Sequence, residues 1–172
     1  MLKLLAKGVG PSLALALAFA VAPGVAQAAL GPDAAACRTG SGQSAVLVTV
    51  NGFKSRTGSV RVNVYGSDPS KFLERGQYVR QINVRVPRSG AMPICVALPD
   101  AGRYAVAVRH DANASGGSDW NDGGGFSRNP RVTLMNRRPR YENVAINVGR
   151  GVVPVNITLL YRFGFSIRPA AG

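Results

Sequence analysis

The chain has 172 residues and is strongly basic, with 21 Lys and Arg against 8 Asp and Glu and a formal net charge of +13. It contains two cysteines and one histidine, which are too few ligands for a zinc centre, and no motif for a Cys–His nucleophile accompanies them. No block of five consecutive basic residues occurs, so we do not expect specific nucleic-acid recognition.

The first 28 residues predict a cleavable signal peptide. Lys3 and Lys7 precede an apolar run at 13–21, and the sequence AQA at 26–28 matches the small-x-small pattern that signal peptidases cut. The apolar run is shorter than the roughly 20 residues that span a bilayer, which favours cleavage over an uncleaved anchor. We therefore expect a periplasmic or secreted protein with no transmembrane segment after processing.

If the protein is exported, its cysteines and its positive charge can be interpreted for an oxidising compartment outside the cytoplasm. Cys37 and Cys95 are an isolated pair in an oxidising compartment, where such pairs form a disulfide. A basic exported protein is attracted to anions, so an anionic envelope component is one expected partner and another protein is a second. The alternative is that the arginines are ordinary surface residues.

From residue 45 onward the hydrophobic period is two, which is typical of strands with one buried face. A helical turn capped by Asp68 or Ser70 is the one expected exception. The turn at 54–58 is predicted to join the first two strands as a hairpin. Strands are expected at 45–53, 58–65, 77–86, 92–98, 103–110, 141–148 and 152–162.

About seven alternating strands predict an all-β fold, a single antiparallel β-sandwich preceded by the signal-peptide helix. The sandwich is expected over 45–163. Residues 29–44 are rich in Ala, Gly and Ser, and we expect a flexible leader that holds Cys37. Residues 164–172 are expected to form a C-terminal tail.

One long loop, between 109 and 130, has the composition of a functional site. Oxygen-bearing residues alternate there and are followed by glycine, as in loops that wrap a calcium ion. The alternative is an Asp/Asn/Gly-rich turn that satisfies its own backbone through Asx-turns. The calcium ligands predicted at 111–122 are Asp111, Asn113, Ser115, the Gly117 carbonyl, Asp119 and Asp122.

The same loop carries other candidates for ligand binding. His110 is the only histidine and Trp120 the only tryptophan of the chain. Trp120 and Phe126 are candidates for an aromatic wall against a sugar or peptide; the alternative is that they cover the edge of the sandwich. No catalytic residue is predicted, because no positioned nucleophile accompanies His110.

The middle of the chain resembles the bacterial domain-of-unknown-function family numbered 2141. The resemblance covers about 45–162 and implies an exported protein with a transthyretin-type or immunoglobulin-like sandwich; it implies no activity. The chain has Ser115 where the family pattern has asparagine. The residues that carry the resemblance are 98–108 (LPDAGRYAVAV), His110, Asp111, Asn113, 125–127 (GFS) and Asn129, with weaker support from 47–60 and 139–144.

Three functions remain open from the sequence. The first is a non-enzymatic binding module of the envelope, with calcium in its loop. The second is a structural or assembly protein that pairs with a partner through a sheet edge. The third is a hydrolase that uses His110 with Asp111 or Asp119.

Overall fold

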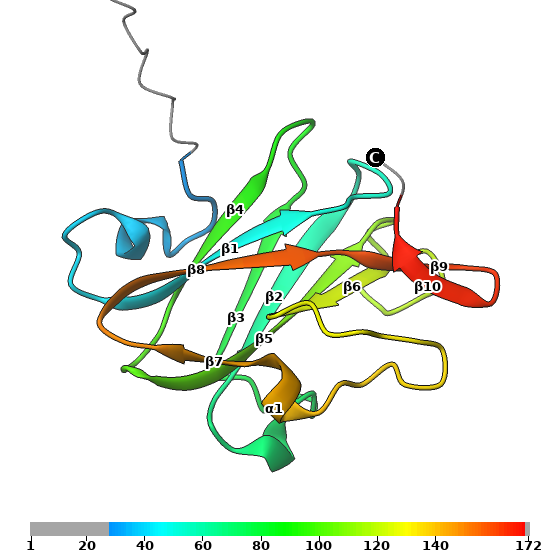
Figure 1. The fold of residues 1–172 in the computed structure, drawn as a ribbon. Helices are drawn as coiled ribbons and strands as arrows, with labels where there is room; N and C mark the ends of the chain where they lie inside the picture. Colours follow the sequence, from blue (N-terminus) through cyan, green and yellow to red (C-terminus); the bar gives the residue numbers. More distant parts are fainter. Residues whose placement is uncertain (1–27, 171–172) are drawn as a thin grey trace, which may run out of the picture.

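The computed structural model describes residues 28–170, which form an all-β, sandwich-like fold of ten strands in two sheets (Figure 1). The predicted fold class is therefore confirmed. The predicted signal peptide lies outside the described residues, except for Ala28. Within the described part, no helix has both the length and the apolar composition needed to cross a membrane.

The smaller sheet has the order β4-β1-β8. It consists of β4 (Met92–Ala97), β1 (Ser44–Asn51) and β8 (Gly151–Thr158). β1 is antiparallel to β4 but parallel to β8, so the prediction of a purely antiparallel sandwich is wrong at this pair. The reason is that the chain enters β8 from a strand of the other sheet and not through a hairpin from β1.

The larger sheet has seven strands, all paired antiparallel. Six follow the order β10-β9-β6-β5-β2-β3, and β7 pairs with the first half of β5. β5 is thus the central strand, and its second half lies between β2 and β6. The bounds are β10 (Ser166–Pro169), β9 (Leu160–Phe163), β6 (Gly123–Phe126), β5 (Gly102–Asp111), β2 (Ser59–Tyr65), β3 (Arg80–Arg85) and β7 (Ala145–Val148).

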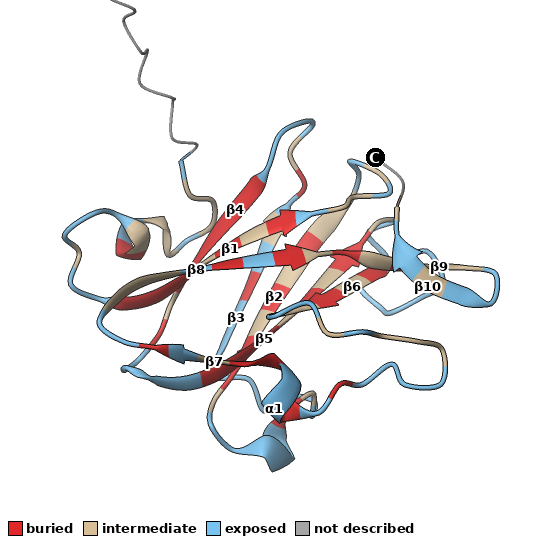
Figure 2. Cartoon of the chain, in the orientation of Figure 1, coloured by how far each residue is buried: buried red, intermediate tan, exposed pale blue. Residues whose placement is uncertain are grey.

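Alternating valines build the core between the two sheets. Val46, Val48 and Val50 of β1 face inward, and every second residue of β2 and β5 does the same. Buried and less buried residues therefore alternate along these strands (Figure 2). Full burial of one such side chain stabilises the fold by roughly 1.5–3 kcal/mol relative to exposure. The opposite face of the larger sheet is therefore free to carry polar residues such as Arg61 and Asn63.

Three local predictions are wrong for topological reasons. The turn at 54–58 joins β1 and β2, which lie in different sheets, so it is a crossover and not a hairpin. The strand predicted at 152–162 is divided at Leu159, whose amide donates to the carbonyl of Asn51, and β9 then joins the larger sheet. The start of the strand predicted at 141–148 is instead α1 (Tyr141–Val144).

The predicted helical turn is confirmed as the 3-10 helix η2 (Pro69–Lys71). Asp68 caps it, since its Oδ1 accepts a hydrogen bond from the Ser70 amide at 3.0 Å. Two strands were missed by the sequence analysis. These are β6, whose first three residues are glycine, and β10, which lies in the expected C-terminal tail.

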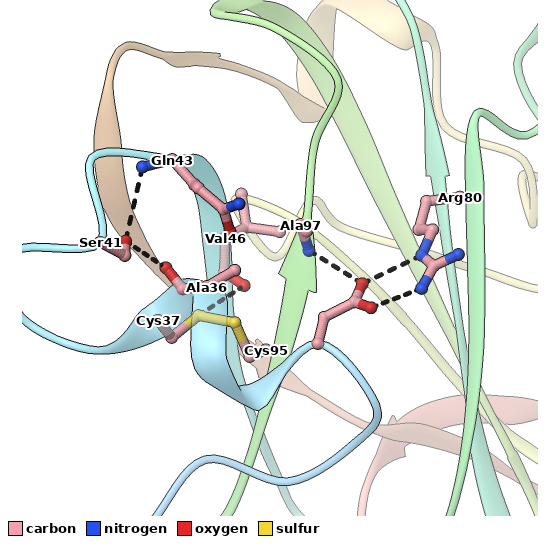
Figure 3. Close-up of a disulfide and its surroundings, with 9 residues drawn as sticks. Ala36, Cys37, Ser41, Gln43, Val46, Arg80, Cys95 and Ala97 are labelled. Atoms are coloured by element: carbon pink, nitrogen blue, oxygen red, sulfur yellow. Dashed lines mark hydrogen bonds and ion pairs between the residues drawn. A yellow bond between two sulfur atoms is a disulfide. The ribbon is translucent and has the colours of Figure 1, made fainter.

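The segment 29–44, expected to be a flexible leader, is folded against β4. Leu30 extends the sheet, because its amide donates to Pro93 at 2.7 Å and its carbonyl accepts from Cys95 at 3.0 Å. The 3-10 helix η1 (Ala34–Cys37) follows, and the predicted Cys37–Cys95 disulfide is present at its end (Figure 3). The disulfide thus fixes this segment to β4, an edge strand of the smaller sheet.

Candidate functional site

His110 lies in the core at the end of β5 and is fully buried. Its Nε2 is 2.8 Å from the Thr57 carbonyl, which only accepts, so Nε2 donates and Nδ1 is left to accept. The Tyr161 hydroxyl, 2.6 Å from Nδ1, is the donor, and burial raises the pKa of Tyr161 to about 12. Its full burial and these two hydrogen bonds give His110 a structural role in the core and do not favour its predicted roles in ligand binding or hydrolysis.

Asp111 shapes the start of the loop between β5 and β6. Its side chain is 6% exposed and accepts two backbone hydrogen bonds, from Ser115 at 3.0 Å and from Gly116 at 2.8 Å. These bonds close a turn in which Gly116 has a φ of +76°, a conformation that glycine adopts without strain. Asp111 therefore has the role of a turn-forming residue in this structure.

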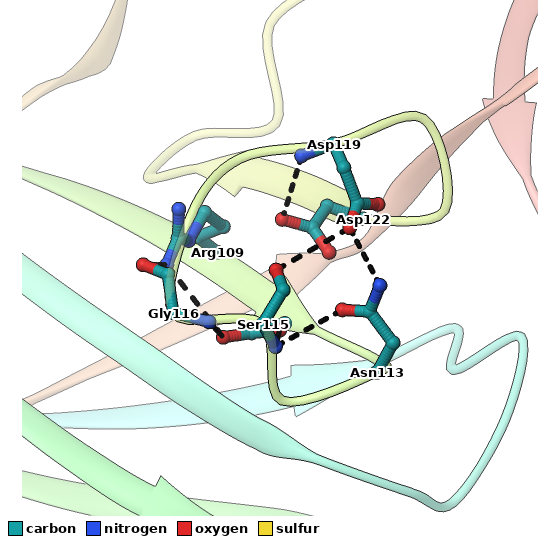
Figure 4. A network of polar contacts seen from close by, with 7 residues as sticks. Arg109, Asn113, Ser115, Gly116, Asp119 and Asp122 are labelled. Carbon is teal, nitrogen blue, oxygen red and sulfur yellow. Dashed lines mark hydrogen bonds and ion pairs between the residues drawn. The ribbon is translucent and has the colours of Figure 1, made fainter.

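The middle of the loop is a network of hydrogen bonds (Figure 4). Asp119 Oδ2 accepts from Asn113 Nδ2 at 2.6 Å and from Ser115 Oγ at 3.3 Å, and its Oδ1 accepts from the Asn121 amide at 2.8 Å. The hydrogen bond from Asn121 contributes most to a lowered pKa of Asp119. The loop thus brings Asn113, Ser115 and Asp119 together through hydrogen bonds between their side chains.

Asp122 completes this network on its inner side. Its Oδ2 accepts from the Asp119 amide at 3.3 Å, whereas its Oδ1 is buried and has no hydrogen-bond partner within residues 28–170. Burial raises the pKa of Asp122 above its usual value. A cation beside it would favour the ionised carboxylate, because ionisation in a buried position is costly.

The loop does not present a ready-made cluster of calcium ligands. Among the described residues, no three His, Cys, Asp or Glu side chains lie close enough to hold a metal ion. Gly117 is exposed, and calcium binding at Asp111 would require its carboxylate to exchange two backbone hydrogen bonds for the ion. Calcium binding by this loop stays a prediction.

An aromatic cluster covers one part of the outer face of the larger sheet, the face turned away from β1. Phe72 is at its centre, with ring centroids 5.4 Å from Tyr65, 5.8 Å from Tyr141 and 6.3 Å from Phe126. Tyr141 and Val144 both pack into it, since residues three apart lie on one side of a helix, and this explains why α1 forms there. Beyond Phe126 the outer face is hollowed.

The first hollow, here called the Trp120 cavity, has a volume of about 620 Å³. Its floor includes Gly124 of β6, where an added Cβ would lie 3.8 Å from the Val108 carbonyl oxygen. One wall is the loop with Trp120, and the opposite walls come from β9, β10 and the segment after β6. Its apolar lining comprises Phe126, Val132, Leu134, Leu160 and Ile167.

Trp120 is held at the rim of this cavity by a cation. The guanidinium carbon of Arg162 lies 3.6 Å from the centroid of the Trp120 ring, a distance at which a cation is attracted to the ring face. Trp120 is otherwise largely accessible, since 71% of it is exposed. Trp120 and Phe126, the two aromatic residues chosen from the sequence, thus both line the cavity.

A second hollow adjoins the first and is called the arginine cavity. Its volume is about 910 Å³, and it shares Arg109, Ser118, Phe126 and Arg137 with the Trp120 cavity. Its charged lining consists of five arginines and one acid: Arg61, Arg75, Arg109, Arg137, Arg138 and Glu74. None of these charged residues was chosen from the sequence, although the outward position of Arg61 within β2 follows from the alternation.

The sequence pattern of a bacterial family described as "uncharacterized protein conserved in bacteria (DUF2141)" matches residues 48–156. The chain belongs to this family. The match confirms the resemblance found in the sequence. It spans the chain from β1 into β8 and includes Trp120, whereas Leu160, Arg162 and Ile167 of the Trp120 cavity lie beyond it. No curated protein and no solved structure matches the chain.

The structure explains the GFS motif of this DUF2141 chain. Gly125 faces the core, where an added Cβ would lie 2.6 Å from Ile157 Cγ2. Phe126 faces outward into the aromatic cluster. Ser127 is fully buried, and its hydroxyl bonds to the backbone of both Val106 and Val144. The motif therefore fixes β6 and α1 against β5, and so builds the floor of the candidate site.

Proposed function

We propose that the chain is an exported, non-enzymatic binding protein whose ligand occupies the Trp120 cavity. The observation that carries this proposal is an apolar hollow on the outer face of a sheet, where alternation leads to a solvated polar surface. Ligand sites are commonly concave, mostly apolar and about 300–1,000 Å³ in volume, and the Trp120 cavity has about 620 Å³.

The shape of the cavity favours a ligand with a flat apolar part. Arg162 covers one face of the Trp120 ring, and Trp120 is largely exposed at the rim. Leu134, Leu160 and Ile167 supply apolar contacts without hydrogen-bonding groups. A ring system lying on Trp120 would therefore bury apolar surface on both of its sides, which is the main source of affinity in such sites.

The smaller sheet gives little support to the alternative of assembly through a sheet edge. Leu30 and the Asp33 side chain already bind the outer edge of β4, at Cys95 and Ala97. At the edge of β8, the Asn129 side chain donates to Asn156 and accepts from Thr158, and Pro154 has no amide to offer. Edges protected in this way resist pairing with another chain.

Trp120 makes the proposal directly testable, because it is the only tryptophan of the chain. We expect anilinonaphthalene sulfonate, which combines fused rings with an anionic group, to quench Trp120 fluorescence in a saturable manner. Gly124→Val should weaken this binding by at least about tenfold, because the new side chain enters the cavity and its Cβ lies in ordinary contact, 3.8 Å from the Val108 carbonyl oxygen. Absence of saturable quenching would contradict the proposal.

The matched control is Gly149→Val, at an exposed turn with no atom within 4 Å of the added Cβ. Equal loss of binding in both variants would also contradict the proposed site. Export is tested separately, by fractionating cells that produce the full chain and sequencing the N-terminus of the exported protein. We expect the first residue to be Ala29; a protein that stays in the cytoplasm would overturn this part.

A further inference from the structure

Two arginines lie directly opposite each other on the floor of the arginine cavity. Arg61 of β2 is paired in register with Arg109 of β5, and both side chains point to the outer face. Directly opposed residues of antiparallel strands have Cβ atoms about 4.5–5.5 Å apart, and like charges at that separation are destabilising. The Nε atoms of both residues are buried and have no hydrogen-bond partner within residues 28–170.

The surrounding charges do not balance this pair. Arg109 has partial compensation, since its Nη2 donates to the Gly116 carbonyl at 2.9 Å and lies 3.8 Å from Asp111 Oδ2. Arg61 forms no ion pair with any acid of the described residues. Glu74, the acid that lines this cavity, lies 3.7 Å from Arg138 instead.

Nothing in the packing requires two cations at these positions. Val60, Val62 and Val108 bury the inner face of the same strands, so the core is complete without the arginines. Polar uncharged residues occupy equivalent outward positions nearby, as in the register pair of Asn63 with Gln81, which share a hydrogen bond of 2.9 Å. The arginine pair thus costs stability in the free protein, and a bound anion would remove that cost.

We propose that Arg61 and Arg109 bind a phosphate ester group of the ligand; this inference rests on the proposed function. A guanidinium presents a planar fork of donors that matches phosphate oxygens. One carboxylate has a single charge and is satisfied by one fork, whereas a phosphate monoester has three acceptor oxygens and up to two charges, and so serves two arginines. Phe126 and Ser118 line both cavities, so one amphiphilic ligand spans them.

Inorganic phosphate is the probe, with acetate as the comparison, in thermal melts and calorimetric titrations at constant ionic strength. We expect phosphate to raise the melting temperature of the wild-type protein and acetate to leave it nearly unchanged. Arg61→Gln should weaken phosphate binding by at least about tenfold. The same variant should raise the melting temperature without phosphate, because it removes the like-charge contact, whereas a structural role for Arg61 predicts a decrease.

Arg150→Gln is the matched control, since Arg150 is exposed and lines neither cavity. Phosphate binding that is unchanged in Arg61→Gln, or equally weakened in Arg150→Gln, would overturn the proposal, and so would equal binding of acetate. Sedimentation with vesicles that contain phosphatidic acid, a lipid with a phosphate monoester, identifies the source: Arg61-dependent co-sedimentation supports a lipid-borne phosphate, and phosphate binding without co-sedimentation supports a soluble ester.

The two proposals fail in different ways. Saturable quenching of Trp120 without any phosphate binding would leave the proposed function standing and overturn this inference. Phosphate binding that depends on Arg61, together with no saturable quenching of Trp120, would overturn the proposed function and leave phosphate binding by the arginines standing.

Discussion

Asp33 joins the two sheets through Arg80. Its carboxylate accepts from both Nε and Nη2 of Arg80, at the start of β3 in the larger sheet, with an Nε–Oδ2 distance of 2.9 Å. The same Oδ2 accepts from the Ala97 amide, at the end of β4 in the smaller sheet, at 3.0 Å (Figure 3). With its side chain 9% exposed, Asp33 is a buried link between neighbouring edges of the sandwich.

We predict that Asp33→Asn lowers the free energy of unfolding by about 2 kcal/mol at neutral pH, since hydrogen bonds to a charged group contribute roughly 1.5–3 kcal/mol. Burial acts to raise the pKa of Asp33, but the hydrogen bonds from Arg80 and Ala97 and the charge of Arg80 outweigh it, and the pKa lies below its ordinary value of 3.8. A lowered pKa in the folded state means that this stability is present above pH 3.8 and is lost as the pH falls through the lowered value.

Urea unfolding of wild type and Asp33→Asn between pH 2 and pH 7 measures the effect. The difference between the two proteins should be largest at neutral pH and should shrink below pH 3.8. Asp100→Asn is the control, because Asp100 is exposed and its side chain takes part in no hydrogen bond or ion pair within the described residues. A difference that is constant with pH would contradict the role assigned to Asp33.

The disulfide gives a second prediction. Cys37 and Cys95 are 58 residues apart in sequence, and closing a loop of that length restricts the unfolded chain by about 4 kcal/mol in the chain-entropy treatment. The double variant Cys37→Ala/Cys95→Ala should lose stability of that order in urea unfolding. Wild type unfolded with a reductant should match the double variant, and an unchanged midpoint in either case would refute the prediction.

The elements predicted most accurately from the sequence are the strands that show a hydrophobic period of two. The strands β1, β2 and β5 were found because valine at every second position can be buried only in an extended chain. Pairing and sheet membership were harder to predict, as the crossover at 54–58 shows. In the structure this segment packs closely on the end of β5. A Cβ added at Gly58 would lie 1.8 Å from the Asp111 carbonyl oxygen, so only glycine fits there.

The site was only partly predictable, because tertiary contacts decide its parts. Trp120 and Phe126 were candidates for an aromatic wall from their position in a long loop, and the structure places both in the lining of one cavity. Arg162 was not, because it lies in a strand far away in sequence and meets Trp120 only after β9 pairs beside β6. The surroundings of His110 were not predictable either, because a lone histidine gives no sign in the sequence of the carbonyl and hydroxyl that bind it in the core.

Adjacent glycines of β6 provide a third prediction with an internal control. Alanine at Gly125 would place its Cβ 2.6 Å from Ile157 Cγ2 and 2.9 Å from the Thr158 carbonyl, so Gly125→Ala should destabilise the protein by about 1–3 kcal/mol, as overpacked cores do. Gly124→Ala meets no such contact and should be neutral or slightly stabilising. Chemical unfolding of both variants measures the contrast, and equal destabilisation would contradict the assigned inner and outer faces.

Asp122 gives the last prediction, which also tests calcium. Burial raises its pKa in the folded state, so its contribution to stability is lost as the pH rises through that raised value. Without calcium, Asp122→Asn should therefore melt at a higher temperature than wild type at pH 7. An ion bound only by the native state stabilises it, so millimolar calcium should raise the melting temperature of wild type and not of Asp122→Asn, while magnesium has a smaller effect. Identical melting curves of wild type with calcium and with chelator would contradict calcium binding. The loop would then be a turn whose polar groups bind one another, as Asp111 binds the amides of Ser115 and Gly116.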